Sequence, residues 1–438
     1  MRETIAGTRW ALGMALLMAY GQAALAACPS WAEGTVYQAG DVVAYQNANY
    51  TALTAHTAYP GANWNPAATP TLWKAGGSCS GGDPTPPTPP NPPTPPSPPP
   101  GTPAPFAKHA LVGYWHNFAN PSGAAFPLAQ VSDDWDVIVV AFADDAGNGN
   151  VSFTLDPAAG SAAQFIQDVR AKQAKGKKVV LSLGGQNGSV TLNNAAQAQN
   201  FVNSLAAIIG QYGFDGIDLD LESGVSVGAP IISNLVSAVK QLKAKIGPSF
   251  YLSMAPEHPY VQGGYVAYGG NWGAYLPIID GLRDDLSVIH VQYYNNGGLY
   301  TPYSTGALPE GSVDMLVGGS KMLIEGFPLG NGASGSFKGL RPDQVAFGVP
   351  SGRSSANSGF VTPDTVAKAL SCLTALQGCG GVLPAQAYPT FRGAMTWSIN
   401  WDRHDGYNFS KPVAASLRQL PVAAASKKKA VRATRTAW

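Results

Sequence analysis

Charged residues are scarce in this 438-residue chain. Lys, Arg, Asp and Glu together make up 12% of the sequence, and the formal net charge is +1. A nearly neutral chain has no broad electric field to attract a polyanion, so nucleic acid is not expected among its partners. The basic run from Lys427 to Arg435 lies in the segment 421–438, which we interpret as a solvated tail.

Long apolar runs and clusters of metal ligands are also lacking. The apolar run from Trp10 to Tyr20 is too short for a stable membrane span. Arginines precede it and small residues follow it, a pattern that predicts a signal peptide over 1–27 and a secreted protein. Neither the six histidines nor the four cysteines have the spacing of a metal site. We therefore expect no metal and no other cofactor.

The four cysteines form two pairs along the chain. Cys28 and Cys79 bracket a short segment, and Cys372 and Cys379 lie close together. Because export permits disulfides, we predict Cys28–Cys79, which would staple a small core, and Cys372–Cys379. Free buried thiols are the alternative, chiefly for the second pair. The sequence 25–28 also resembles a bacterial lipoprotein box, in which Cys28 would be acylated instead.

Aromatic residues and prolines divide the rest of the chain into three regions. Region 28–79 is short and aromatic, with alternating runs at 41–45 and 49–53 that predict small strands. Region 80–107 is dominated by Pro-Pro-Thr and Pro-Pro-Ser steps, which favour polyproline II and predict a semi-rigid spacer. The alternative for this region is a proline-motif ligand for another protein. Region 108–420 is long enough to form one large domain.

Short apolar strands alternate with helical patterns in region 108–420. Helical periodicity covers, for example, 161–174, 195–212 and 231–246, and such alternation implies a parallel sheet. Eight strands in about 310 residues predict an α/β fold, a (β/α)8 TIM barrel, whose active site lies at the C-terminal ends of the strands. The candidate strands are Ala110–Tyr114, Val137–Phe142, Lys178–Leu183, Gly216–Leu221, Tyr251–Ala255, Val288–Tyr293, Val345–Val349 and Gly393–Ser398.

One candidate strand carries a row of carboxyl groups. In residues 214–222, Asp218, Asp220 and Glu222 alternate with aliphatic residues. Because successive side chains of a strand point to opposite faces, the three carboxyl groups share one face. Groups this close cannot all ionise at neutral pH, so at least one should keep its proton, as a general acid must. The alternative is a solvated edge strand, which the aliphatic opposite face disfavours.

The third candidate strand ends with Ser-x-Gly-Gly at 182–185, and the fourth carries Asp-x-x-Asp-x-Asp-x-Glu at 215–222. The order of these two motifs resembles that in the chitinases of glycoside hydrolase family 18. The ends of the fifth, sixth and eighth strands, at 254–257, 292–295 and 395–398, carry fitting chemistry. The resemblance therefore covers region 108–420.

The resemblance implies a retaining, substrate-assisted mechanism. Glu222 would donate the proton, and the substrate's own 2-acetamido oxygen would be the nucleophile. Asp220 would orient the acetamido group and share a proton with Asp218 or Glu222. Tyr294 would hydrogen-bond the acetamido oxygen, whereas Tyr293 is expected to face the helices.

Further site residues are implied around this group. Trp397 would form an apolar floor under the sugar. Gln292, Asn295 and Met254 are expected as additional pocket residues, with ordinary barrel packing as the alternative for Gln292 and Met254. The resemblance also implies non-proline cis peptide bonds at Ala141–Phe142 and Trp397–Ser398.

Region 28–79 resembles the small chitin-binding modules of carbohydrate-binding family 5/12. The match rests on the spacing of its aromatic residues and on its final cysteine. Ala55-His56 stand where some members have paired tryptophans, so the platform is expected to use other rings. We expect Tyr59 and Trp64, in a loop rich in Pro and Gly, to stack on sugars, and Trp73 to lie in the core.

Together these features predict a secreted, monomeric chitinase that hydrolyses internal β-1,4 bonds of N-acetylglucosamine polymers. One alternative is an endo-β-N-acetylglucosaminidase acting on glycans, which would not need a chitin-binding module. A second is a non-catalytic chitin-binding protein, which would typically lack the acid at position 222. The interval 351–392 is too short for an additional subdomain, so we expect an open cleft.

Overall fold

The computed structural model describes residues 28–33, 35–58, 64–77 and 106–421. The predicted signal peptide, most of the Pro-rich spacer and nearly all of the basic tail lie outside these residues. Tyr59 and the Cys79 end of the predicted Cys28–Cys79 disulfide also lie outside them. The chain divides into two compact units, Met1–Pro99 and Pro100–Trp438.

The N-terminal unit is a small β structure. Its core consists of Trp73, which is 2% exposed, packed against Tyr37, Val43, Ala52 and Ala58. The runs predicted as strands correspond to two neighbours in its antiparallel sheet. That sheet has the order β2 (Val42–Tyr45), β3 (Ala48–Ala52) and β5 (Trp73–Ala75), and β1 (Val36–Tyr37) pairs separately with β4 (His56–Thr57).

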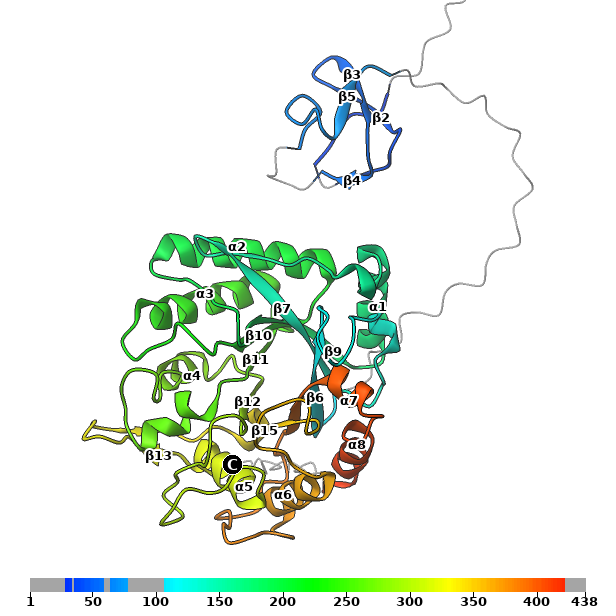
Figure 1. Ribbon diagram of the computed structural model, residues 1–438. Helices are drawn as coiled ribbons and strands as arrows, with labels where there is room; N and C mark the ends of the chain where they lie inside the picture. The colour runs from blue at the N-terminus through cyan, green and yellow to red at the C-terminus, as the bar shows by residue number, and fades with distance from the viewer. Residues whose placement is uncertain (1–27, 34, 59–63, 78–105, 422–438) are drawn as a thin grey trace, which may run out of the picture. The chain divides into compact units, whose positions relative to one another are not determined.

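The C-terminal unit is a closed barrel of parallel strands surrounded by helices, as predicted (Figure 1). The first strand pairs with both the second and the last, which closes the barrel. Each predicted strand end agrees with the structure within two residues, with one exception. The barrel strands are β6 (Ala110–His116), β7 (Val137–Gly147), β9 (Lys178–Gly184), β10 (Gly216–Asp220), β11 (Tyr251–Met254), β12 (Val288–Gln292), β15 (Val345–Pro350) and β16 (Gly393–Trp397).

The exception is β7, which continues five residues beyond its predicted end and forms a hairpin with β8 (Asn150–Ser152). Asn148 and Gly149 connect the two strands with φ angles of 53° and 79°. Positive φ at both central residues is the geometry of a type I′ turn, for which Asn-Gly is the preferred pair. The Asn-Gly pair is therefore a sequence signal for a hairpin. The predicted strand ends before this pair, so the prediction does not include the hairpin.

Helices cover the outside of the barrel. The helix α2 shows why these segments begin and end where they do: the Asn194 side chain accepts a hydrogen bond from the Gln197 N–H, and Gly213 ends the helix with a φ of 77°. In the described ranges, no helix combines the length and apolar character needed to cross a membrane. The α-helices are α1 (Ala162–Ala174), α2 (Ala195–Tyr212), α3 (Pro230–Ile246), α4 (Leu276–Leu282), α5 (Val313–Glu325), α6 (Pro363–Ala375), α7 (Ile399–His404) and α8 (Ser410–Gln419).

The strands bury both faces, but the two faces have different neighbours. In β7, Val137 and Val139 belong to the cluster inside the barrel, whereas Ile138 and Val140 belong to the cluster between the sheet and the helices. This alternation follows from the two-residue period of a strand. It decides which side chains can reach the barrel mouth.

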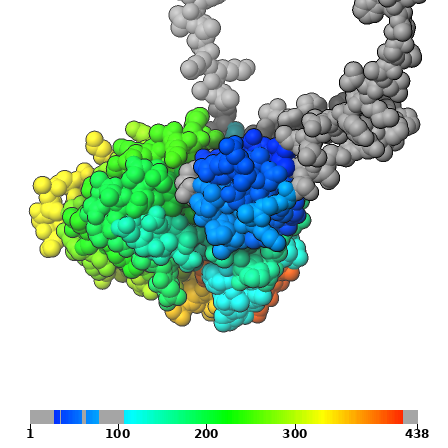
Figure 2. Space-filling view, turned by 90° about the horizontal axis from the view of Figure 1, so that it is seen from above, coloured from blue at the N-terminus to red at the C-terminus, as the bar shows by residue number. Residues whose placement is uncertain are grey.

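The interval between β15 and β16 carries little additional structure. Residues 351–392, all of them described, contain α6 and the predicted Cys372–Cys379 disulfide but no further helix or strand. No separate subdomain is present there, as predicted. On another side, β13 (Phe327–Pro328) and β14 (Ser336–Phe337) form a small hairpin that projects from the domain surface, in yellow (Figure 2).

Candidate active site

The row of carboxyl groups lies inside the barrel at the C-terminal end of β10. Asp218 is 0% exposed and Asp220 is 3% exposed, whereas Ile217 and Leu219 face the helices. The strand pairs with β9 on one side and β11 on the other, so the alternative of a solvated edge strand is wrong. Glu222 lies two residues beyond the strand and is half-buried.

Glycines next to this row allow the backbone to pack closely. A Cβ on Gly184, whose φ is 105°, would lie 2.2 Å from the backbone oxygen of Asp220. The N–H of Gly185 donates to the same oxygen at 2.7 Å. The Ser-x-Gly-Gly motif therefore lets the third strand approach the fourth closely, at a position where a side chain would clash.

Hydroxyl groups from three other strands hold Asp218. The Tyr114 hydroxyl donates to Oδ2 at 2.6 Å and the Ser182 hydroxyl to the same oxygen at 2.8 Å. The Ser253 hydroxyl donates to Oδ1 at 2.6 Å, and His290 Nε2 lies 3.7 Å from that atom. The sequence analysis placed only Ser182 in a motif. Tyr114, Ser253 and His290 could have been identified from the alternation along their strands, which turns their side chains into the barrel.

The amide of Gln292 links the two other carboxyl groups. Its Nε2 donates to Asp220 Oδ1 at 2.9 Å, to Glu222 Oε1 at 3.0 Å and to the Ala255 carbonyl at 2.9 Å. The predicted pocket residue on β12 thus lies beside the carboxyl groups. One amide with two hydrogens holds both carboxyl oxygens close together.

Burial and mutual repulsion favour protonation of this pair. Burial raises the pKa of Asp220 well above its usual value, and the charges of Glu222 and Asp218 add to the effect. Burial also raises the pKa of Glu222, with a further contribution from Glu257, while the Gln292 hydrogen bond opposes the shift. A carboxyl group that keeps its proton at the mouth of the barrel can act as a general acid.

Tyr294 shares this environment, and Tyr293 does not. Burial raises the pKa of Tyr294 well above its usual value, and Asp220 and Glu222 raise it further, so the phenol stays protonated as a hydrogen-bond donor. Tyr293 instead lies in the cluster facing the helices, where its hydroxyl accepts a hydrogen bond from Gln262 Nε2 at 2.7 Å. The predicted orientation of Tyr293 is confirmed.

Trp397 belongs to an aromatic group beside the row. Its ring centroid lies 4.6 Å from that of His116 and 6.0 Å from that of Phe142, which is nearly parallel to it. Burial lowers the pKa of His116 to about 3, so its ring packs as a neutral group. The predicted cis peptide bonds at Ala141–Phe142 and Trp397–Ser398 are both present.

Of the remaining predicted pocket residues, Met254 does not face the barrel interior. Met254 is fully buried in the cluster between strands and helices, because the alternation along β11 turns Ser253 and Ala255 inward. The expectation that Met254 lines the pocket is therefore wrong. Asn295 is exposed with a φ of 64°, and its Oδ1 accepts the N–H groups of 357 and 358, so it holds the loop after β15.

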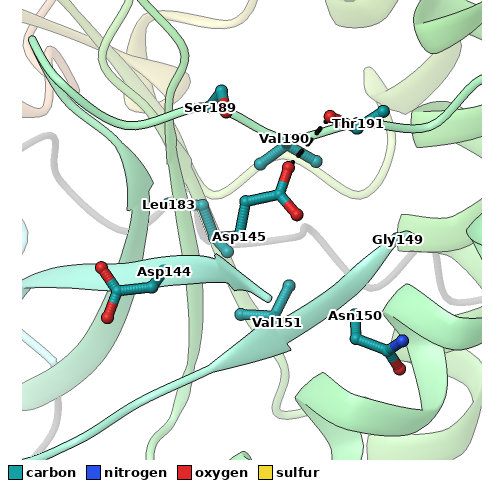
Figure 3. A pocket seen from close by; sticks show the side chains of 9 residues that line it. All are labelled: Asp144, Asp145, Gly149, Asn150, Val151, Leu183, Ser189, Val190 and Thr191. Carbon is teal, nitrogen blue, oxygen red and sulfur yellow. Dashed lines mark hydrogen bonds between the residues drawn. The ribbon is translucent and has the colours of Figure 1, made fainter. Parts of the chain in front are cut away.

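A small hollow beside the β7–β8 hairpin is separate from the carboxyl row. Its lining includes Asp144, Asp145 and Thr191, and none of the catalytic candidates. The Thr191 hydroxyl donates to Asp145 Oδ2 at 3.0 Å, and the Asp144 carboxyl group points away from that pair (Figure 3). The hollow therefore adds no group to the candidate active site.

Comparisons with known proteins find similar sequences and a similar solved structure. Residues 110–313 match glycosyl hydrolases family 18, and residues 30–74 match carbohydrate-binding module family 5/12. Chitinase Chi52 of Paenibacillus xylanexedens is 35% identical over 92% of this chain and 94% of its own length. Exochitinase 1 of Streptomyces olivaceoviridis is 43% identical over 71% of this chain and 56% of its own. The crystal structure of a family GH18 chitinase from Chromobacterium violaceum is 82% identical, with a TM-score of 0.71, and the match covers 90% of this chain and all of that one.

The variant Asp220→Asn is expected to be more stable than the wild type at neutral pH. Because burial and nearby charges raise the folded-state pKa above its usual value of 3.8, the folded protein binds more protons than the unfolded chain above that pH. The free energy of unfolding contributed by this group therefore falls as the pH rises. An amide cannot ionise, and its oxygen can still accept the Gln292 hydrogen bond.

Calorimetric unfolding temperatures should show this gain at neutral pH and its disappearance below about pH 4, where the wild-type carboxyl group is protonated in both states. Asp284→Asn, an exposed position at the opposite end of the barrel, is the control and should show no such gain. An Asp220→Asn protein less stable than the wild type at neutral pH contradicts the argument.

Proposed function

This chain belongs to glycoside hydrolase family 18, and from that membership we propose that it is a chitinase that hydrolyses β-1,4 bonds between N-acetylglucosamine units. The observation that carries the proposal is the position of Glu222 at the barrel mouth, where Gln292 links it to Asp220 and where burial raises its pKa. The relatives named chitinase support the same substrate. The match of residues 30–74 to a carbohydrate-binding module also supports a polymeric carbohydrate substrate.

We propose that the reaction retains the anomeric configuration through the substrate's own acetamido group. Glu222 donates its proton to the glycosidic oxygen as the bond to the anomeric carbon breaks. The acetamido carbonyl oxygen forms a bond to the same carbon, giving an oxazolinium ion. Water then attacks the anomeric carbon, and the oxazolinium ring opens to restore the acetamido group. The Glu222 carboxylate takes the proton from the attacking water.

The neighbours of the acid suit the remaining tasks. Asp220 accepts from Gln292 through Oδ1, which leaves Oδ2 to orient the acetamido N–H. Tyr294, kept protonated, can donate to the acetamido oxygen as that oxygen approaches the anomeric carbon. Trp397, supported by His116 and Phe142, offers an apolar face for the sugar ring.

We propose that cleavage is mainly internal. Supporting this, the interval 351–392 holds only α6 and a disulfide loop, so it contributes no subdomain that could wall the cleft. An open cleft lets a long chain bind across the acid at any point along its length. One relative is named an exochitinase, so cleavage from a chain end is the alternative mode of action.

The N-terminal unit, in this proposal, holds the secreted enzyme on insoluble chitin. Trp64 is 37% exposed, and its backbone oxygen accepts the indole N–H of the buried Trp73 at 3.2 Å. This hydrogen bond holds the Trp64 backbone, and the exposed indole can stack on the apolar face of a sugar. The proline-rich spacer allows the unit to act separately from the catalytic domain.

Glu222→Gln should lose hydrolysis and keep binding. Gln has the shape of Glu but no transferable proton, so turnover of N-acetylglucosamine oligomers should fall by about 10²–10⁴-fold, as expected for general acid catalysis. Oligomer affinity, measured by calorimetry, should change little. The wild type should release the β anomer first in NMR spectra, and initial α product or near-normal turnover by the variant contradicts the mechanism.

The mode of attack can be measured on a long soluble chitin derivative. Internal cleavage should lower viscosity early, while few reducing ends have been released. Release of disaccharide from the start, with viscosity nearly constant, would instead show action from a chain end.

Trp64→Ala should weaken binding to crystalline chitin and leave hydrolysis of soluble oligomers unchanged. Leu53→Ala is the matched control, because Leu53 is also an exposed apolar residue of the same unit, 50% exposed, but has no ring to stack. Pull-down on chitin particles measures both variants. Equal loss of binding in the two, or loss of soluble activity in Trp64→Ala, contradicts an aromatic platform at this position.

A further inference from the structure

The mouth of the barrel gathers four carboxyl groups. Asp218, Asp220 and Glu222 are joined there by Glu257, which follows β11. In the part of the chain that the structure describes, none of these four forms an ion pair with a lysine or arginine. The imidazole near Asp218, that of His290, stays neutral because burial lowers its pKa. Carboxyl groups that share protons but have no lysine or arginine partner still carry a net negative charge, which favours a ligand of the opposite sign.

Glu257 lies close to the reacting groups without belonging to their hydrogen-bond network. Its backbone bridges to Gln292, the residue that holds Asp220 and Glu222. Its carboxylate is near enough to raise the pKa of Glu222, Asp220 and Tyr294, in each case after the larger effect of burial. Glu257 also continues the alternation of the inward-facing Ser253 and Ala255, which puts it on the barrel-interior side of the chain.

One oxygen of Glu257 is held and the other is available. Asn296 Nδ2 donates to Oε1 at 2.8 Å, and Asn296 is itself fixed because its backbone N–H donates to Glu310 Oε1 at 2.9 Å. The side chain of Glu257 is half-buried, and Oε2 has no hydrogen-bond partner among the described residues. A fixed carboxylate with a free oxygen at the edge of a cleft can accept a hydrogen bond from a ligand.

A fully acetylated chain gives this carboxylate only neutral donors. Where an acetyl group has been removed, the sugar carries an ammonium group, and a hydrogen bond between an ammonium and a carboxylate is roughly twice as strong as one between neutral groups. The cleaved sugar itself must keep its acetamido group, because the acetamido oxygen is the nucleophile. An ammonium can therefore be accepted only on a neighbouring sugar.

We propose that Glu257 is a specificity-determining residue that favours a protonated glucosamine next to the acetylated sugar being cleaved, so that partly deacetylated chitin is a preferred substrate. This inference rests on the proposed function. It assigns to Glu257 a contact with substrate and no part in proton transfer.

The test compares oligomers of one length: the fully acetylated chain, and the isomers in which a single unit is glucosamine. For each isomer, kcat/KM is divided by the value for the fully acetylated chain. The wild type should prefer one isomer, and Glu257→Gln should reduce that preference roughly two- to fivefold, the range for a partly exposed ion pair. Because both substrates depend on Glu222 in the same way, the ratio does not respond to a change in the pKa of the acid.

Controls separate charge from shape. Gln at position 257 can still accept from Asn296, so the loop is expected to keep its fold, which an unchanged unfolding temperature verifies. Asp284→Asn removes the same charge at the opposite end of the barrel and should leave the ratio unchanged. In the wild type, added salt should weaken the preference, as should a pH at which the amine is uncharged.

The proposal is overturned if the wild type prefers no singly deacetylated isomer, or if Glu257→Gln retains the full preference. Failure to cleave the fully acetylated oligomer at all would instead reject the proposed function, so the two outcomes are distinguishable.

Discussion

Burial of carboxyl groups on the inward face of one barrel strand is the constraint on which the rest of this structure depends. Ionised carboxylates are costly to bury unless hydrogen bonds or charges compensate them. Here Asp218 is compensated by hydroxyl groups from β6, β9 and β11, and Asp220 by the amide of Gln292 from β12. Five strands must therefore keep their register for the row to be tolerated.

The same constraint creates the chemistry. Asp218 has enough donors to be held in place, whereas Asp220 and Glu222 share one amide between them. Burial, and after it the charges of neighbouring carboxyl groups, raises the pKa of both groups, and the shared amide opposes this shift only in part. A proton is therefore left where a leaving group can use it. Stability is given up locally at the site where activity needs it.

Glu257 and Asn296 show how loops add specificity to a barrel. Neither contributes to the closure of the sheet, and both follow strands at its C-terminal edge. Their contact places a carboxylate beside the acid, where it changes the charge of the cleft without altering the strand register that the row requires. Loops on this face can therefore vary while the carboxyl row stays unchanged.

By itself the sequence determined what depends on local periodicity. Alternation along 214–222 places three carboxyl groups on one face, and the strand–helix repeat predicts the barrel. The pair Asn148-Gly149 indicates a hairpin turn that the predicted strands did not include. These signals are local because strand and turn geometry depend on neighbouring residues.

Only the tertiary structure decided which side chains meet across the barrel. Tyr114, Ser253 and His290 lie far from Asp218 along the chain, and their approach depends on how the strands are staggered when the sheet closes. The same closure brings Asn295 to the loop after β15, which its side chain holds. Closure of the sheet sets distances between residues remote in sequence, and the pattern of a single strand contains no information about them.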